Sequence, residues 1–130
     1  MNTEQLFLGI DGGQSGTRCL IVDQTGKVFA QATSDKIDFV LASGGKAKLK
    51  ATLSSLLSKA CSNRPPKFRS ACLGLSGVTQ DGELEQVVQD VCGEIFETDQ
   101  LVIDNDSLIA WAGAFACQPG IVIIAGSGSV

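Results

Sequence analysis

The chain has 130 residues, of which 44% are hydrophobic, and its formal net charge is −4. This length is typical of one domain, and this hydrophobic content is enough to bury a core. The mild acidity and the lack of a basic stripe argue against a nucleic-acid partner, and no apolar stretch is long enough to cross a bilayer, so no membrane partner is expected.

The sequence contains no histidine and no tyrosine. This excludes Ser-His-Asp and Cys-His catalysis as well as imidazole metal sites. Any chemistry must rest on carboxylates, hydroxyls, lysine, arginine, backbone amides and a hard metal ion. The five cysteines are scattered without a CxxC motif, and Met1–Gln5 lacks the charged region of a secretory leader. We therefore expect buried, reduced thiols and a cytoplasmic protein.

The stretch that organises the chain lies near its start. Two apolar runs, Leu6–Ile10 and Cys19–Val22, are expected to be strands, and small residues from Asp11-Gly12-Gly13 to Thr17 connect them. Glycine lets backbone amides approach a ligand closely, and a cluster of such amides can bind phosphate. Asp11 stands where the first strand ends, placed to face a metal ion or its bound water. The alternative is a plain hairpin, since Asp-Gly is a common turn.

The later chain alternates helices with strands. The expected elements are a strand over Val28–Thr33, a helix from Lys46 to Ala60, a strand over Arg69–Leu75, a helix entered at Thr79–Gly82 and continuing through Cys92, a strand over Leu101–Ile103, a helix over Ser107–Phe115 and a strand over Ile121–Ala125. The order βββ-α-β-α-β-α indicates an α/β fold with a mixed sheet whose later strands are parallel.

Three strand ends carry residues suited to a site. They are Asp11-Gly12-Gly13, Leu75-Ser76-Gly77 and Asp104-Asn105-Asp106. Ligands bind at the carboxyl ends of strands in such sheets, so their convergence predicts a binding site. Asn105 or Asp106 is expected to cap the following helix, which is the purely structural alternative for Asp106.

The last residues resemble the beginning of a second unit. The apolar run Ile121–Ala125 is followed by Gly126–Ser129, which repeats the pattern of strand and small-residue turn near the start. We expect one lobe over residues 1–118 and the start of a second, truncated lobe over residues 119–130. A flexible Gly/Ser tail is the alternative.

Four motifs, in order, resemble one family: the BadF/BadG/BcrA/BcrD ATPases and N-acetylglucosamine kinases of the actin-like ATPase and sugar kinase superfamily. The motifs are Asp11-Gly12-Gly13-Gln14-Ser15-Gly16-Thr17, Cys72–Val78, Ile103–Asp106 with the helix after it, and Ile123–Ser129. The family commonly has glycine in place of Gln14 and threonine in place of Ser15. Its Asn-centred sugar motif does not align with Ser34–Phe39.

The resemblance implies a ribonuclease H-like lobe with a five-stranded sheet in the order 3-2-1-4-5, flanked by helices. It also implies ATP and Mg²⁺ as cofactors and phosphoryl transfer to a hydroxyl of an amino sugar such as N-acetylglucosamine or glucosamine. The lobe is expected to be inactive alone, and a homodimer is left open. The alternative activity is an ATPase that couples hydrolysis to a partner protein.

The resemblance also implies roles for individual residues. Asp11 would hold Mg²⁺, and Asp106 would be the catalytic base, with Asp104 as its rival. Ser76 and Gly77, with Asp106, would bind the sugar. The phosphate contacts would come from Gly12, Gly13, Gln14, Ser15 and Thr17, and from Gly126, Ser127 and Gly128 in the second lobe.

Overall fold

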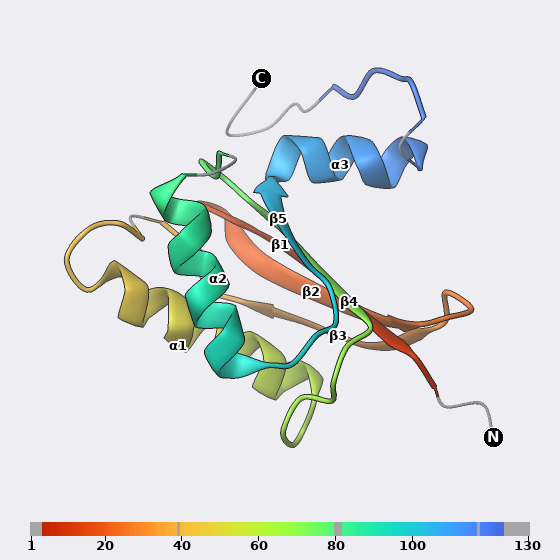
Figure 1. The fold of residues 1–130 in the computed structure, drawn as a ribbon, viewed down its shortest axis with the longest axis horizontal. Coiled ribbons are helices and arrows are strands. Elements are labelled where there is room, and N and C mark those ends of the chain that lie inside the picture. Colours follow the sequence, from red (N-terminus) through yellow and green to blue (C-terminus); the bar gives the residue numbers. More distant parts are fainter. Residues whose placement is uncertain (1–3, 39, 80–81, 117, 124–130) are drawn as a thin grey trace.

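The computed structural model describes residues 4–38, 40–79, 82–116 and 118–123. Within them, five strands and three helices follow one another as β1-β2-β3-α1-β4-α2-β5-α3 (Figure 1). Their bounds are Leu6–Gly13 for β1, Gly16–Asp23 for β2, Val28–Ser34 for β3, Gly45–Ala60 for α1, Ser70–Leu75 for β4, Glu83–Ile95 for α2, Leu101–Asn105 for β5 and Asp106–Phe115 for α3. The predicted α/β architecture is confirmed.

The strands form one mixed sheet in the order β3-β2-β1-β4-β5, which confirms the predicted order. The pairs β1/β2 and β2/β3 are antiparallel, whereas β1/β4 and β4/β5 are parallel. The carboxyl ends of β1, β4 and β5 therefore meet at one edge of the sheet, where the three predicted strand-end motifs lie.

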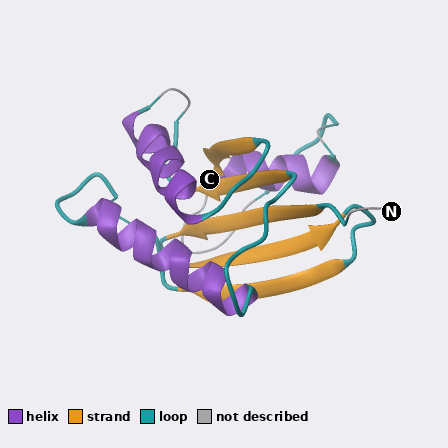
Figure 2. Cartoon of the chain, turned by 60° about the horizontal axis from the view of Figure 1, so that its bottom comes forward, coloured by secondary structure: helices purple, strands orange, loops and turns teal. Residues whose placement is uncertain are grey.

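Helices α1 and α2 cover one face of the sheet, and α3 lies on the other (Figure 2). The hydrophobic core lies between the sheet and the helices α1 and α2, and its apolar side chains are almost completely buried. They include Leu8, Ile10, Ile21, Leu53, Leu56, Leu73, Val88 and Val91. Each fully buried side chain of this kind stabilises the fold by about 1.5–3 kcal/mol. The apolar residues whose helical spacing predicted α1 and α2 are thus the ones that lie on the buried faces of these helices.

Several strands are longer than predicted. Pairing between β1 and β2 continues through Asp11 to Gly13 and Gly16, because ladder hydrogen bonds need only the backbone and not the apolar side chains that predicted the strand cores. The predicted strand over Ile121–Ala125 is not present in its described part. Ile121 and Ile123 lie outside helix and strand and are 86% and 84% exposed, whereas Ile124 and Ala125 lie outside the described residues.

Four of the five cysteines lie within the described residues. Cys19, Cys61 and Cys92 are buried and Cys72 is half-buried, and none of these four forms a disulfide. Burial raises the pKa of the Cys92 thiol to about 12, so this group is inert near neutral pH. Cys117 lies outside the described residues.

Candidate active site

The turn between β1 and β2 is the first component of the site. The two strands pair as far as Gly13 and Gly16, which leaves a two-residue turn of Gln14 and Ser15. Gly16 has a φ of 141°, a conformation that favours glycine. The connection is therefore a two-residue hairpin turn, and the binding of phosphate by its backbone amides stays a prediction.

Glycines let this turn approach the end of β4. A Cβ on Gly12 would lie 2.9 Å from Cδ2 of Leu75, and a Cβ on Gly13 would lie 2.5 Å from Oγ of Ser76. The Ser76 amide donates to the Gly12 carbonyl at 3.1 Å. A side chain at Gly13 would push Ser76 away, so the glycine keeps these two strand ends in contact.

Asp106 enters from the third strand end, at the first position of α3. Its Oδ2 accepts a hydrogen bond from Oγ of Ser76 at 2.9 Å, and its Oδ1 lies 2.9 Å from the donating amide of Ser107. The Ser107 amide also donates to Oδ1 of Asn105, which is the N-cap of α3. A carboxylate has about four acceptor positions, so these contacts orient Asp106 and still leave it able to accept a ligand proton.

Gly74 sets the distance between α3 and β4. A Cβ at this position would lie 2.9 Å from Cβ of Ile109 and 3.3 Å from Cα of Asp106. Without a side chain at Gly74, the first turn of α3 packs directly on the strand. This close packing brings Asp106 within hydrogen-bonding distance of Ser76.

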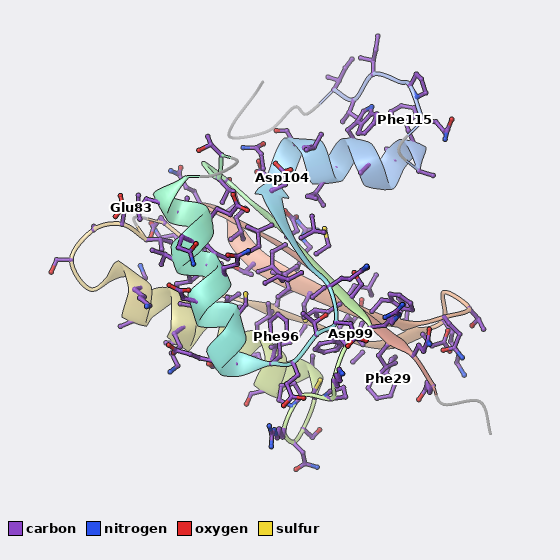
Figure 3. The ribbon with its side chains drawn as sticks, viewed as in Figure 1. Phe29, Glu83, Phe96, Asp99, Asp104 and Phe115 are labelled. Carbon is purple, nitrogen blue, oxygen red and sulfur yellow. The ribbon has the colours of Figure 1, made fainter. Side chains whose placement is uncertain are left out.

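A cavity of about 420 Å³ lies at this edge of the sheet. Its lining residues come from β1, β2 and the turn between them, from the end of β3, from the residue after β4 and from the start of α3: Asp11, Gly12, Gly13, Gln14, Ser15, Gly16, Thr17, Arg18, Thr33, Ser34, Ser76 and Asp106. Asp11 and Asp106 thus face the same cavity. Asp104, the rival base, does not line it. Figure 3 shows Asp104 where β5 meets α3, and its Oδ1 accepts a hydrogen bond from the Asn105 amide at 2.7 Å.

Arg18 supplies positive charge to this lining. Its Nε lies 3.5 Å from Oδ2 of Asp11, and the two side chains are 77% and 59% exposed. An exposed pair of this kind contributes about 0–1 kcal/mol, so either group can turn towards a ligand at small cost. An exposed carboxylate beside several hydroxyls also fits Mg²⁺, which prefers oxygen ligands and keeps several of its waters.

Thr17 is buried, with 3% of its surface exposed. Its Oγ1 donates to the Asp35 carbonyl at 2.7 Å. The hydroxyl therefore ties the turn to the segment after β3, and direct contact with a phosphate oxygen would require this bond to open.

The remaining predicted site residues lie elsewhere. Gly77 does not line the cavity, and its φ of 80° turns the chain away after Ser76. Gly126, Ser127 and Gly128 lie outside the described residues, so their phosphate contacts stay predictions.

Sequence reasoning missed several residues, among them Arg18, Thr33 and Gly74. A signal for Arg18 was present, because a two-residue turn closed by Gly13 and Gly16 places Arg18 opposite Asp11. Thr33 reaches the cavity because β3 pairs with β2, and Gly74 allows α3 to pack closely on β4. Residue spacing alone reveals neither contact.

Comparison with known proteins supports the resemblance. No family model matches the chain. The chain is 28% identical over 137 residues to N-acetyl-D-glucosamine kinase of Dictyostelium discoideum, an alignment that covers 98% of the chain and 43% of that protein. It is 25% identical over 126 residues to N-acetylmuramic acid/N-acetylglucosamine kinase of Clostridium acetobutylicum, covering 95% of the chain and 40% of the relative.

Solved structures agree with the curated relatives. A protein of Chromobacterium violaceum, provisionally named N-acetylglucosamine kinase, superposes with a TM-score of 0.62 at 26% identity, over 92% of this chain and 41% of that one. In sequence and in fold, the chain is therefore similar to the N-terminal two fifths of N-acetylglucosamine kinases. A second provisionally named N-acetylglucosamine kinase, from Porphyromonas gingivalis, has a TM-score of 0.58 at 17% identity over 77% of this chain and 34% of its own, and supports the fold alone.

The chain spans about two fifths of the length of the curated relatives that it matches. Within the described residues, no helix is both long and apolar enough to span a bilayer.

Proposed function

We propose that this chain is the N-terminal lobe of a kinase that transfers the γ-phosphoryl group of ATP to a hydroxyl of an amino sugar such as N-acetylglucosamine or glucosamine. The observation that carries this proposal is that Asp11, the β1–β2 turn and Asp106 line one cavity. The names of the two curated relatives support the same class of substrate.

The turn and Asp11 would face the nucleotide. Phosphoryl transfer depends chiefly on alignment and on neutralising charge on the phosphate oxygens. Backbone amides of the Gly12–Ser15 stretch would donate to the β- and γ-phosphates, and the Arg18 guanidinium would add positive charge beside them. Asp11 would hold Mg²⁺ through water, and the ion would supply further charge neutralisation when bound.

Asp106 would act as the general base. The Ser76 hydroxyl and the Ser107 amide hold its carboxylate at 2.9 Å each, which orients it towards the cavity without blocking every acceptor position. A sugar hydroxyl placed between Asp106 and the γ-phosphate would lose its proton to this carboxylate as the new O–P bond forms.

Three further expectations belong to this proposal. Residues 119–130 would begin a second lobe that completes the nucleotide site, so the chain alone would be inactive. A homodimer is an expected assembly to test, and the cytoplasm is the expected compartment because it supplies ATP and keeps thiols reduced.

The test is ADP release by the complete product of the gene with Mg·ATP and a panel of N-acetylglucosamine, glucosamine, N-acetylmuramic acid and glucose. We expect release that depends on an amino sugar. Asp106→Asn should lower kcat by about 10²–10⁴-fold, whereas the matched variant Asp104→Asn should keep most of it. ATP hydrolysis that ignores the sugar would favour the partner-coupled ATPase, and normal turnover by Asp106→Asn would remove the base assignment.

A further inference from the structure

The segment after β3 is joined to both arms of the β1–β2 turn. We call residues 35–38 the strap. The Asp35 carbonyl accepts the Thr17 hydroxyl proton at 2.7 Å, and the Ile37 amide donates to the Gly13 carbonyl at 2.9 Å. The strap therefore contacts the turn on the β1 side and on the β2 side.

Asp38 fastens the strap to α1. Its side chain is only 6% exposed, and each carboxylate oxygen has its own cation. Lys36 Nζ lies 2.9 Å from Oδ2, and Nζ of Lys48, in the first turn of α1, lies 3.1 Å from Oδ1. Hydrogen bonds from Lys36 and then Lys48 hold the pKa of Asp38 below its ordinary value, so the carboxylate is ionised at neutral pH.

The N-terminus of α1 has no side-chain cap of its own. Its first turn contains no acidic residue, and its N-cap, Gly44, offers no side-chain cap. Lys48, in the first turn of α1, is the helix residue whose ammonium group contacts Asp38. Asp38 thus joins three parts in series: the helix, the strap and the turn.

We propose that Asp38 is a positioning residue for the β1–β2 turn. Its carboxylate keeps the strap at a fixed place, and the strap holds Gly13 and Thr17, the two arms from which the turn projects into the cavity. The identity of the ligand at the turn rests on the proposed kinase function. The coupling of Asp38 to the turn through the strap is independent of the proposed kinase function.

The test compares Asp38→Asn with Asp99→Asn. Asp99 is a matched control because its carboxylate also has two cations, Lys67 Nζ at 2.9 Å and Arg69 Nη1 at 3.2 Å. Figure 3 shows Asp99 near the start of β5, at the end of the sheet away from the junction with α3. Both variants remove one charge and weaken two ion pairs.

Amide hydrogen exchange of this chain is the decisive measurement. In Asp38→Asn, exchange at Ile37 and across residues 13–17 should accelerate by roughly tenfold or more, because local opening of the strap exposes them. In Asp99→Asn, exchange at these amides should match the wild type. Unchanged exchange in Asp38→Asn, or equal acceleration in both variants, would overturn the proposal. If Asp38→Asn does not fold, Lys48→Met, which removes only the link to α1, should accelerate the same amides.

A kinetic arm separates this proposal from the proposed function. In the complete gene product, Asp38→Asn should raise the KM for ATP several-fold, with kcat and the KM for the sugar changing less. Equal changes in kcat and in the KM for ATP would count against a positioning role. Absence of sugar-dependent turnover in the wild type would contradict the kinase function, while the exchange result would still decide whether Asp38 controls the turn.

Discussion

Replacement of Gly74 by alanine tests whether close packing of α3 on β4 positions Asp106. The new Cβ would lie 2.9 Å from Cβ and 3.0 Å from Cγ1 of Ile109, and 3.3 Å from Cα of Asp106. Ordinary carbon contacts are about 3.5–4.0 Å. Because two of these neighbours are branch-point or main-chain carbons, rotation of a flexible side-chain end cannot relieve the clash.

The helix must therefore move away from β4 by about 0.5–1 Å, the difference between these two sets of distances. The bond from Ser76 Oγ to Asp106 Oδ2, now 2.9 Å, would lengthen to the limit of hydrogen bonding or break. Inserting a methyl group into a packed site costs about 1–3 kcal/mol. For a chain of this size the melting temperature should fall by about 4 °C for each kcal/mol.

Urea denaturation and amide exchange in α3 are the assays, with Gly113→Ala as the matched control. Gly113 lies inside α3, and a Cβ there meets no atom within 4 Å. Alanine at Gly113 should stabilise the helix by about 0.5–1 kcal/mol, whereas alanine at Gly74 should destabilise the chain and accelerate exchange at the start of α3. If both variants change stability in the same direction, close approach at Gly74 does not hold α3.

Three further outcomes are expected. Arg18→Met should change the free energy of unfolding by less than about 1 kcal/mol, because the ion pair between Arg18 and Asp11 is exposed. Titration calorimetry of the complete gene product should nevertheless show weaker Mg·ATP binding. Unchanged binding would exclude Arg18 from the phosphate site. Ser76→Ala should destabilise the chain by about 0.5–1.5 kcal/mol and lower kcat more than it raises the KM for ATP. Acid should reduce the stability of the fold. Hydrogen bonds to lysine lower the pKa values of Asp38 and Asp99 in the folded chain. The stabilisation from these two carboxylates is therefore complete above their ordinary pKa of 3.8 and is lost as pH falls through their lower pKa values in the folded chain. Melting temperatures that stay constant from pH 5 to pH 2.5 would contradict this assignment.

The fold could be predicted because its elements carry strong apolar patterns. The helical spacing of Leu49, Leu53, Leu56 and Leu57 marks the face that α1 buries, and the first strand is a continuous apolar run. The extension of β1 and β2 to Gly13 and Gly16 could not be predicted in this way. It depends on backbone pairing that continues after the apolar residues end.

The site was predictable only in part, for a related physical reason. Asp11 and Asp106 could be proposed because they come directly after apolar strand cores at a common sheet edge, and both line the cavity, while their roles stay predictions. The contribution of Gly74 depends on the missing Cβ opposite Ile109, and that of Ile37 on a main-chain amide that donates to Gly13. Close approach at a glycine and hydrogen bonds of the backbone do not depend on a pattern of residue types, so a single sequence does not reveal them.

The register of the sheet explains why one carboxylate, one hydroxyl and one turn converge. It places three residues of adjacent strands in one row: Gly12, the last residue of β1 that pairs with β4, Leu75, the last of β4, and Asn105, the last of β5. The residue after each of them, Gly13, Ser76 and Asp106, forms the next row, in which a Cβ on Gly13 would collide with Ser76 and Ser76 donates to Asp106. A parallel sheet repeats such a row at about 4.8 Å from strand to strand, a spacing that polar side chains can bridge directly. The position of Asp106 relative to the β1–β2 turn is therefore set by the pairing of β1, β4 and β5, and the loops need only begin at the same row.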